Sequence, residues 1–177
     1  MIPLFSAPFL FLRHGETDAN AADLIGGTQD LPLNATGHAQ ARRAAEILAG
    51  QGLAAIWCSP LRRAYQTAAA VAERTGLALQ IVEGLGERDW GDWEGRPRAA
   101  LIRDATPPGG ESPESFRRRT LAALAGIAPP FPVLVVAHSG TARVIAAELA
   151  VSATLRAGNA EPVLWRPEPD GWWRHPL

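Results

Sequence analysis

Phe9-Leu10-Phe11-Leu12-Arg13-His14-Gly15-Glu16-Thr17 is the stretch that decides how the rest of the chain is arranged. Its four apolar residues have the length of a short buried strand, and they lead directly into a guanidinium, an imidazole and a glycine. A buried strand that ends in charged side chains can place them in a surface crevice, as in many active sites. The tripeptide Arg-His-Gly also arises by chance, so its meaning depends on the residues downstream.

A second apolar run, Val133-Leu134-Val135-Val136-Ala137, also ends in a histidine, His138. Further strand candidates over residues 54–58 and 77–82 alternate with helical patterns, which predicts an α/β fold with parallel strands and right-handed crossovers. Ligands of an open α/β sheet bind outside the carboxyl ends of its strands. We therefore expect His14 and His138 to lie in one crevice.

The helices and turns follow from the remaining periodicity. We expect a loop over residues 18–36, a helix opening at Gly37, a helix starting at Ser59-Pro60, a helix from Ser112-Pro113 to about Gly126, a helix after His138, and a terminal strand or hairpin around Pro167 to Asp170. Proline at the first helical position and serine just before it are typical helix starts.

The composition sets limits on the fold and on the partners. A chain of 177 residues with 47% hydrophobic content is expected to form a single domain, residues 1–177. A formal net charge of -1 leaves no global field for nucleic acid or an anionic membrane, so neither is an expected partner. All basic residues are arginine, so an arginine is informative only inside a motif.

The single cysteine, Cys58, excludes an internal disulfide and a multi-thiolate metal site, and its apolar surroundings predict a buried small side chain. This usage fits a reducing compartment. Residues 1–8 have no positively charged start and contain two prolines, unlike a signal peptide. We expect a cytoplasmic protein.

Two strand-end histidines with an adjacent arginine favour a functional site over structural core histidines. A metal site is disfavoured, because no carboxylate stands at ligand spacing beside His14 or His138. A serine hydrolase at Ser139 is disfavoured by the absence of the glycine-flanked elbow, and no Walker sequence is present. Arginines with imidazoles fit a phosphoryl group, on which a neutral histidine can act as nucleophile and near which a carboxylic acid should protonate the leaving oxygen.

Several blocks in order along residues 9–150 resemble the histidine phosphatase superfamily, in its phosphoglycerate-mutase-like branch. The blocks are Leu12-Arg13-His14-Gly15-Glu16-Thr17 with Asn20, Gly27 to Gly37, Ser59-Pro60-Leu61-Arg62-Arg63-Ala64-Tyr65-Gln66-Thr67-Ala68, Glu87 before Gly91-Asp92-Trp93-Glu94-Gly95, Pro108-Gly109-Gly110-Glu111-Ser112, and His138-Ser139-Gly140. Several ordered blocks are far harder to obtain by chance than one. The resemblance implies a three-layer sandwich whose central, mostly parallel sheet has helices on both faces.

The resemblance also assigns catalytic roles. His14 would be the nucleophile and phosphate carrier, and Glu87 would protonate the leaving oxygen and later activate water. Arg13, Arg63 and a protonated His138 would bind the transferring phosphoryl group. Of the two adjacent arginines in the second block, Arg63 aligns with the phosphate-binding position, and Arg62 is expected to face solvent. Glu83 and Glu94 lie near Glu87 and stay open as alternative proton donors.

The remaining implied roles concern substrate contact. Asn20 would add a hydrogen bond, and Thr28 and Ser139 would touch the substrate, whereas Glu16 and Thr17 would only shape the loop. No metal and no cofactor are implied.

Three functions remain open. Only residues 96–106 separate Gly95 from the next loop, where mutases of the family carry a large insertion, so a phosphatase acting on a small phosphorylated metabolite is favoured, such as those resembling alpha-ribazole phosphatase. A phosphoglycerate mutase-type phosphotransferase and a non-catalytic phospho-ligand-binding protein are the alternatives. The specific substrate and the oligomeric state are open. Trp172 and Trp173 could form a homodimer contact, but packing at the edge of the sheet is the favoured interpretation.

Overall fold

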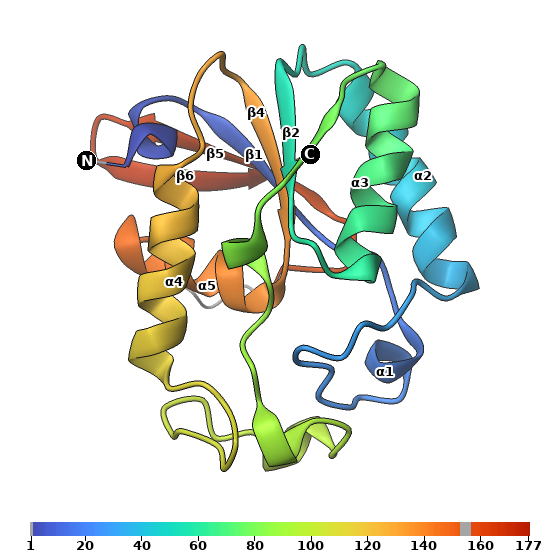
Figure 1. The fold of residues 1–177 in the computed structure, drawn as a ribbon. Coiled ribbons are helices and arrows are strands. Elements are labelled where there is room, and N and C mark those ends of the chain that lie inside the picture. Colours follow the sequence, from blue (N-terminus) through green and yellow to red (C-terminus); the bar gives the residue numbers. More distant parts are fainter. Residues whose placement is uncertain (1, 153–156) are drawn as a thin grey trace.

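The computed structural model describes residues 2–152 and 157–177, whose strands form one six-stranded sheet of order β3-β2-β4-β1-β5-β6 (Figure 1). The strands are β1 (Phe9–Arg13), β2 (Ala55–Cys58), β3 (Leu79–Ile81), β4 (Val133–Ala137), β5 (Pro162–Glu168) and β6 (Gly171–Pro176). The pairs β1–β4, β2–β4 and β2–β3 are parallel, and β1–β5 and β5–β6 are antiparallel. The expected α/β fold with a mostly parallel sheet is confirmed, and the C-terminal pair is the expected hairpin.

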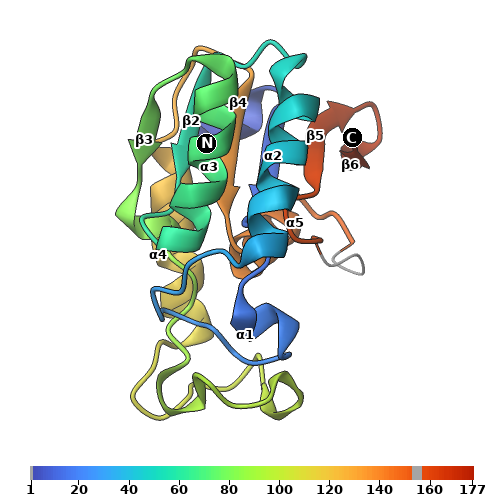
Figure 2. The same ribbon diagram turned by 90° about the vertical axis from the view of Figure 1, so that its right-hand side faces the viewer.

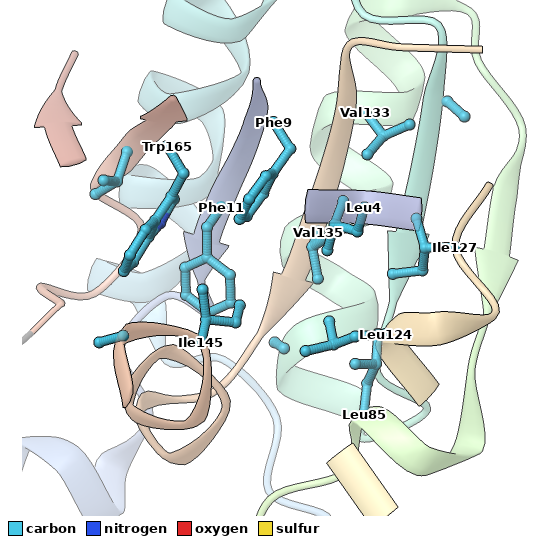
Figure 3. Close-up of a cluster of buried hydrophobic side chains, with 14 residues drawn as sticks. Leu4, Phe9, Phe11, Leu85, Leu124, Ile127, Val133, Val135, Ile145 and Trp165 are labelled. Carbon is cyan, nitrogen blue, oxygen red and sulfur yellow. The ribbon is translucent and has the colours of Figure 1, made fainter. Parts of the chain in front are cut away.

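Helices cover both faces of this sheet (Figure 2). α2 (Ala35–Ala49) and α3 (Arg62–Thr75) cover one face, and α4 (Pro113–Ala125) and α5 (Ser139–Glu148) cover the other. Alternate residues of β1 serve the two faces: Leu10 and Leu12 pack with α2 and α3, whereas Phe9 and Phe11 belong to the opposite cluster (Figure 3). A strand covered on both sides must be apolar throughout, which explains the continuous run Phe9 to Leu12.

The two histidines follow neighbouring strands at one edge of the sheet. Arg13 pairs with Ala137 across the β1–β4 ladder, and the His14 N–H donates to the Ala137 carbonyl over 3.0 Å. The short helix α1 (Asp18–Ala21) and the segment between β3 and α4 lie beyond the carboxyl ends of these strands (Figure 1). That segment holds the short 3-10 turns η2 (Glu83–Leu85), η3 (Gly91–Trp93) and η4 (Arg98–Ala100); a further turn, η1 (Pro3–Ser6), precedes β1.

One additional helix and two helix starts differ from the sequence predictions. The predicted loop over 18–36 contains α1, which Thr17 caps, and α2 begins before Gly37 because the Asn34 side chain accepts the Gly37 N–H. The prediction that a helix starts at Ser59-Pro60 is wrong, because α3 begins at Arg62. The Ser59 hydroxyl lies 2.8 Å from His138 instead, so this serine belongs to the site. Ser112 caps α4 as predicted.

One smaller expectation can be compared with the structure. Cys58 is fully buried, as its surroundings predicted, and burial raises the pKa of its thiol to about 11. Within residues 2–152 and 157–177, no helix is both long enough and apolar enough to cross a membrane.

Candidate active site

His14 lines a pocket at the carboxyl ends of β1 and β4. Its Nδ1 lies 2.7 Å from the Gly15 carbonyl oxygen, which can only accept, so Nδ1 carries the proton and Nε2 carries the lone pair. Burial, followed by the charges of Arg63 and Arg13, holds the pKa of His14 well below its ordinary value. The imidazole is therefore neutral at neutral pH, which is the form that can act as a nucleophile.

His138 is fully buried next to His14 and is not part of the pocket lining; its ring centroid lies 5.2 Å from that of His14. Its Nε2 contacts the Ser59 hydroxyl at 2.8 Å, and its buried Nδ1 has no hydrogen-bond partner among the described residues. Burial, Arg63 and His14 lower the pKa of His138, so the protein alone favours the neutral ring over the protonated one expected from the family resemblance. A bound anion beside Nδ1 would favour protonation.

Two buried arginines converge on the same pocket. Arg13 ends β1 and donates to the Ala157 carbonyl at 3.0 Å. Arg63, in the first turn of α3, donates to the carbonyls of Gln29 and Gly27, each at 2.7 Å. These carbonyls hold each guanidinium in one orientation, which suits recognition of a tetrahedral anion.

The neighbouring Arg62 is exposed, as expected from the sequence. Of the pair, Arg63 is the one that is buried and lines the pocket, and its binding of phosphate stays a prediction.

Glu87 supplies a carboxylate to the pocket. One carboxylate oxygen accepts the backbone N–H of Arg88 at 2.9 Å, and the other accepts that of Gly140, in the first turn of α5, at 3.1 Å. The two alternative proton donors, Glu83 and Glu94, are both outside the pocket lining, and Glu94 accepts a hydrogen bond from the Thr28 N–H. Glu87 is therefore the carboxyl group that can reach a ligand beside His14.

Of the three residues predicted to contact substrate, two line the pocket and one does not. Asn20 and Ser139 line the pocket, and the Ser139 hydroxyl lies 3.5 Å from Glu87. Thr28 is outside the lining, because its N–H and hydroxyl both donate to Glu94. A contact between Thr28 and the substrate stays a prediction.

The backbone of residues 14–17, the histidine loop between β1 and α1, is fixed by very close contacts. A Cβ added to Gly15 would lie 2.6 Å from the Gly37 carbonyl oxygen, so a side chain has no space there. The Gly15 N–H donates to Thr67, whose hydroxyl donates in turn to the Arg63 carbonyl. Glu16 accepts from Asn34, in agreement with its predicted role in shaping the loop. The loop of the nucleophile is thus tied to the helix that carries Arg63.

Sequence reasoning missed four residues that shape the site. Arg98 and Arg143 line the pocket, and Arg98 also pairs with Asp23 at 3.3 Å. Asn159 donates to the His14 carbonyl at 3.0 Å from a point 145 positions away in the chain. Ser59 has the local sequence pattern of a helix cap but contacts His138. In a chain whose basic residues are all arginine, nothing marked Arg98 or Arg143 as special.

The charge of the pocket favours an anion. Among the described residues, its lining holds Arg13, Arg63, Arg98 and Arg143 against one carboxylate, Glu87. The described part of the chain contains no group of three or more His, Cys, Asp or Glu side chains that could hold a metal ion.

Comparison with known proteins agrees with this geometry. The family described as the histidine phosphatase superfamily (branch 1) matches residues 9–163, which include both histidines, Arg63 and Glu87. The chain belongs to the histidine phosphatase superfamily. The family match extends from β1 into β5, so it covers the strands that carry the site.

Several relatives of this histidine phosphatase have named activities. A glucosyl-3-phosphoglycerate phosphatase of Mycobacterium tuberculosis is 34% identical over 164 residues, covering 79% of this chain and 74% of its own. The adenosylcobalamin/alpha-ribazole phosphatase of Escherichia coli is 33% identical over 155 residues, covering 78% and 76%.

Solved structures give the same picture. A mycobacterial glucosyl-3-phosphoglycerate phosphatase in complex with VO3 has a TM-score of 0.79 at 30% identity and covers 97% of both chains. A putative alpha-ribazole-5'-P phosphatase from Escherichia coli has a TM-score of 0.83 at 27% identity, covering 97% of this chain and 95% of its own. The protein is accordingly a phosphatase, a phosphoric monoester hydrolase of this superfamily.

Proposed function

We propose that residues 1–177 act as a single phosphatase domain that hydrolyses a small phosphorylated metabolite through a phosphohistidine on His14, without a metal or cofactor. The observation that carries the proposal is the state of His14. A ring that is neutral, has its lone pair on Nε2 and lies among buried arginines is prepared to attack phosphorus.

In the first step, Nε2 of His14 forms a bond to phosphorus while the ester P–O bond breaks. Glu87 donates its proton to the leaving alcohol oxygen, so that no free alkoxide is released. The Gly15 carbonyl accepts the Nδ1–H of His14 and stabilises the positive charge that the ring acquires. Arg13 and Arg63 bind the phosphoryl oxygens, whose charge they offset.

In the second step, the Glu87 carboxylate takes a proton from water as the water oxygen bonds to phosphorus. The P–N bond breaks, inorganic phosphate leaves, and His14 returns to its neutral form. His138 would donate from Nδ1 to a phosphoryl oxygen, because its other ring nitrogen is held by Ser59. Asn20 and Ser139 would complete the contacts.

Hydrolysis of p-nitrophenyl phosphate by the purified protein in EDTA tests the proposal. We expect turnover in the wild type, loss of turnover in His14→Ala, and full turnover in His38→Ala, a matched control on the exposed surface of α2. Turnover that EDTA abolishes, or that His14→Ala retains, would contradict the proposal.

A further inference from the structure

The pocket around His14 is too small for a whole metabolite. Its volume is about 40 Å³. Pockets that enclose complete small molecules have about 300 Å³ or more, whereas a phosphoryl group needs far less. The alcohol portion of a substrate must therefore lie outside this pocket, on the side where the ester bond breaks.

A second cavity of about 300 Å³ adjoins the first. The two share Glu87, Trp90 and Arg143 in their linings. Glu87 is the group that protonates the leaving oxygen in the proposed reaction, so the carbon bonded to that oxygen must begin beside Glu87. The second cavity starts at this point.

The wall of this cavity is continuous from the carboxylate to an aromatic ring. A Cβ added to Gly140 would lie 2.1 Å from a Glu87 carboxylate oxygen and 2.8 Å from the edge of Phe116, so both side chains lie against Gly140. Beyond Phe116 the cavity is lined by Val144 and Ala147 of α5. Trp90 and Pro113 add to this apolar surface, and the charged residues Arg88, Arg103, Asp104, Arg117 and Arg143 complete the lining.

A competing cavity on another side of Glu87 is less suitable. Its volume is about 440 Å³, but Glu87 is the one residue in its lining that also lines the pocket of His14 within the described chain. Its lining also holds Glu83, Asp89 and Glu111 against one arginine, Arg119, which is paired with Glu111 at 2.8 Å, so the excess of carboxylates would repel an anionic ester. The cavity beside Phe116 instead combines an apolar surface with the guanidinium of Arg143 at its junction with the catalytic pocket.

We propose that the cavity lined by Phe116, Val144 and Ala147 binds the alcohol portion of the substrate, and that this portion is an apolar alkyl or aryl group. The inference rests on the proposed function, because it uses Glu87 to locate the leaving oxygen. Burial of an apolar group against these side chains would favour its esters over polar ones of equal size.

The test compares n-butyl phosphate with 4-hydroxybutyl phosphate, which share chain length and have nearly equal leaving-group acidity. We expect the wild type to prefer the butyl ester by about 10-fold or more in kcat/KM, since the terminal hydroxyl would lose its hydration in the cavity. We also expect kcat/KM to rise from ethyl through propyl to butyl phosphate.

A pair of variants locates the preference. Ala147→Trp fills the cavity from an exposed position on α5, and Ala122→Trp introduces the same side chain at an exposed position of α4 outside the cavity. We expect the butyl preference to fall towards unity in Ala147→Trp and to persist in Ala122→Trp. Equal kcat/KM for the two esters in the wild type, or a preference that Ala147→Trp retains, overturns the inference.

Hydrolysis of p-nitrophenyl phosphate separates the two proposals. If that reaction depends on His14 but the esters are not discriminated, the cavity assignment alone fails. If it does not depend on His14, the proposed function fails and the inference fails with it.

Discussion

At the scale of single residues, the site consists of groups whose protonation is set by the backbone and side chains around them. The Gly15 carbonyl fixes the proton of His14 on Nδ1, and Ser59 holds one nitrogen of His138. The Leu61 N–H also donates to this serine oxygen, at 3.2 Å. When the Ser59 hydroxyl donates to Nε2, the neutral His138 presents an N–H, not a lone pair, at Nδ1.

Ser59→Ala should therefore impair catalysis although Ser59 touches no reacting atom. We expect kcat for p-nitrophenyl phosphate to fall by about 10- to 100-fold, as for other groups that orient functional imidazoles. Ser59→Thr, which keeps the hydroxyl, should restore most of the activity. Profiles of kcat against pH should change shape in Ser59→Ala, and an unchanged profile with equal damage in both variants would indicate a purely structural role.

The role of Glu87 predicts a dependence on the leaving group. p-Nitrophenolate is a good leaving group without protonation, whereas an alkoxide must be protonated as it leaves. Glu87→Gln should therefore slow formation of the phosphohistidine from alkyl phosphates far more than from p-nitrophenyl phosphate. We expect about 10²- to 10⁴-fold for the alkyl ester, measured as kcat/KM. Equal losses for both substrates would show that Glu87 is not the proton donor.

At the scale of elements, the site depends on the close contact between the histidine loop and the start of α2. Gly15 and Gly37 meet backbone to backbone, and neither has space for a Cβ. Gly50, at the opposite end of α2, has space for a side chain: an added Cβ would meet nothing within 4 Å, and its φ of -86° suits any residue. Gly15 and Gly50 therefore provide a matched comparison of a glycine without space for a side chain and one with space.

Gly15→Ala should destabilise the protein and displace His14. We expect a loss of about 1–3 kcal/mol in the free energy of unfolding, because the new methyl group must push apart two backbone segments. Gly50→Ala should be nearly neutral. Urea unfolding of both variants checks the expectation, and a Gly15→Ala protein as stable and active as the wild type would contradict it.

The elements also show what the sequence could predict. β1 and β4 were predictable because a strand buried on both faces is continuously apolar, and the hairpin because turn residues separate two apolar runs. The start of α3 was not, because Ser59-Pro60 has the local pattern of a helix cap while the serine is used by His138, 79 residues away. Local patterns do not record such tertiary demands.

The site residues likewise divide into those that stand in recognisable sequence blocks and those that no local pattern marks. His14, Arg13, Arg63 and His138 stand in ordered blocks of the sequence; the first three line one pocket, and the ring of His138 lies 5.2 Å from that of His14. Arg98 and Arg143 were missed because arginine is ubiquitous in this chain, and Asn159 because its partner is far away in sequence.

At the scale of the whole molecule, burial of two neutral histidines makes stability depend on pH. The pKa of His14 is lower in the folded protein than its ordinary value of 6.5, and that of His138 is also lowered. Below about pH 6.5 the unfolded chain therefore binds more protons than the folded one, and stability falls as the pH falls towards the folded-state pKa values.

Thermal unfolding between pH 8 and pH 5 measures this contribution. We expect the Tm of the wild type to fall more steeply than that of His14→Gln, which removes one buried imidazole and its repulsion of His138. His38→Gln, at an exposed position, should follow the wild type. Parallel curves for all three proteins would show that the buried histidines do not govern acid stability.

The central claim, that phosphate passes through His14, is tested most directly by trapping the phosphorylated enzyme. Glu87→Gln should accumulate the intermediate from p-nitrophenyl phosphate, because the good leaving group permits its formation while loss of the base slows its hydrolysis. After an alkaline quench, we expect mass spectrometry to find acid-labile phosphate on the peptide that carries His14 and none in the His14→Ala/Glu87→Gln double variant. Phosphate on another residue, or undiminished turnover by His14→Ala with no phosphorylated peptide, would contradict the account.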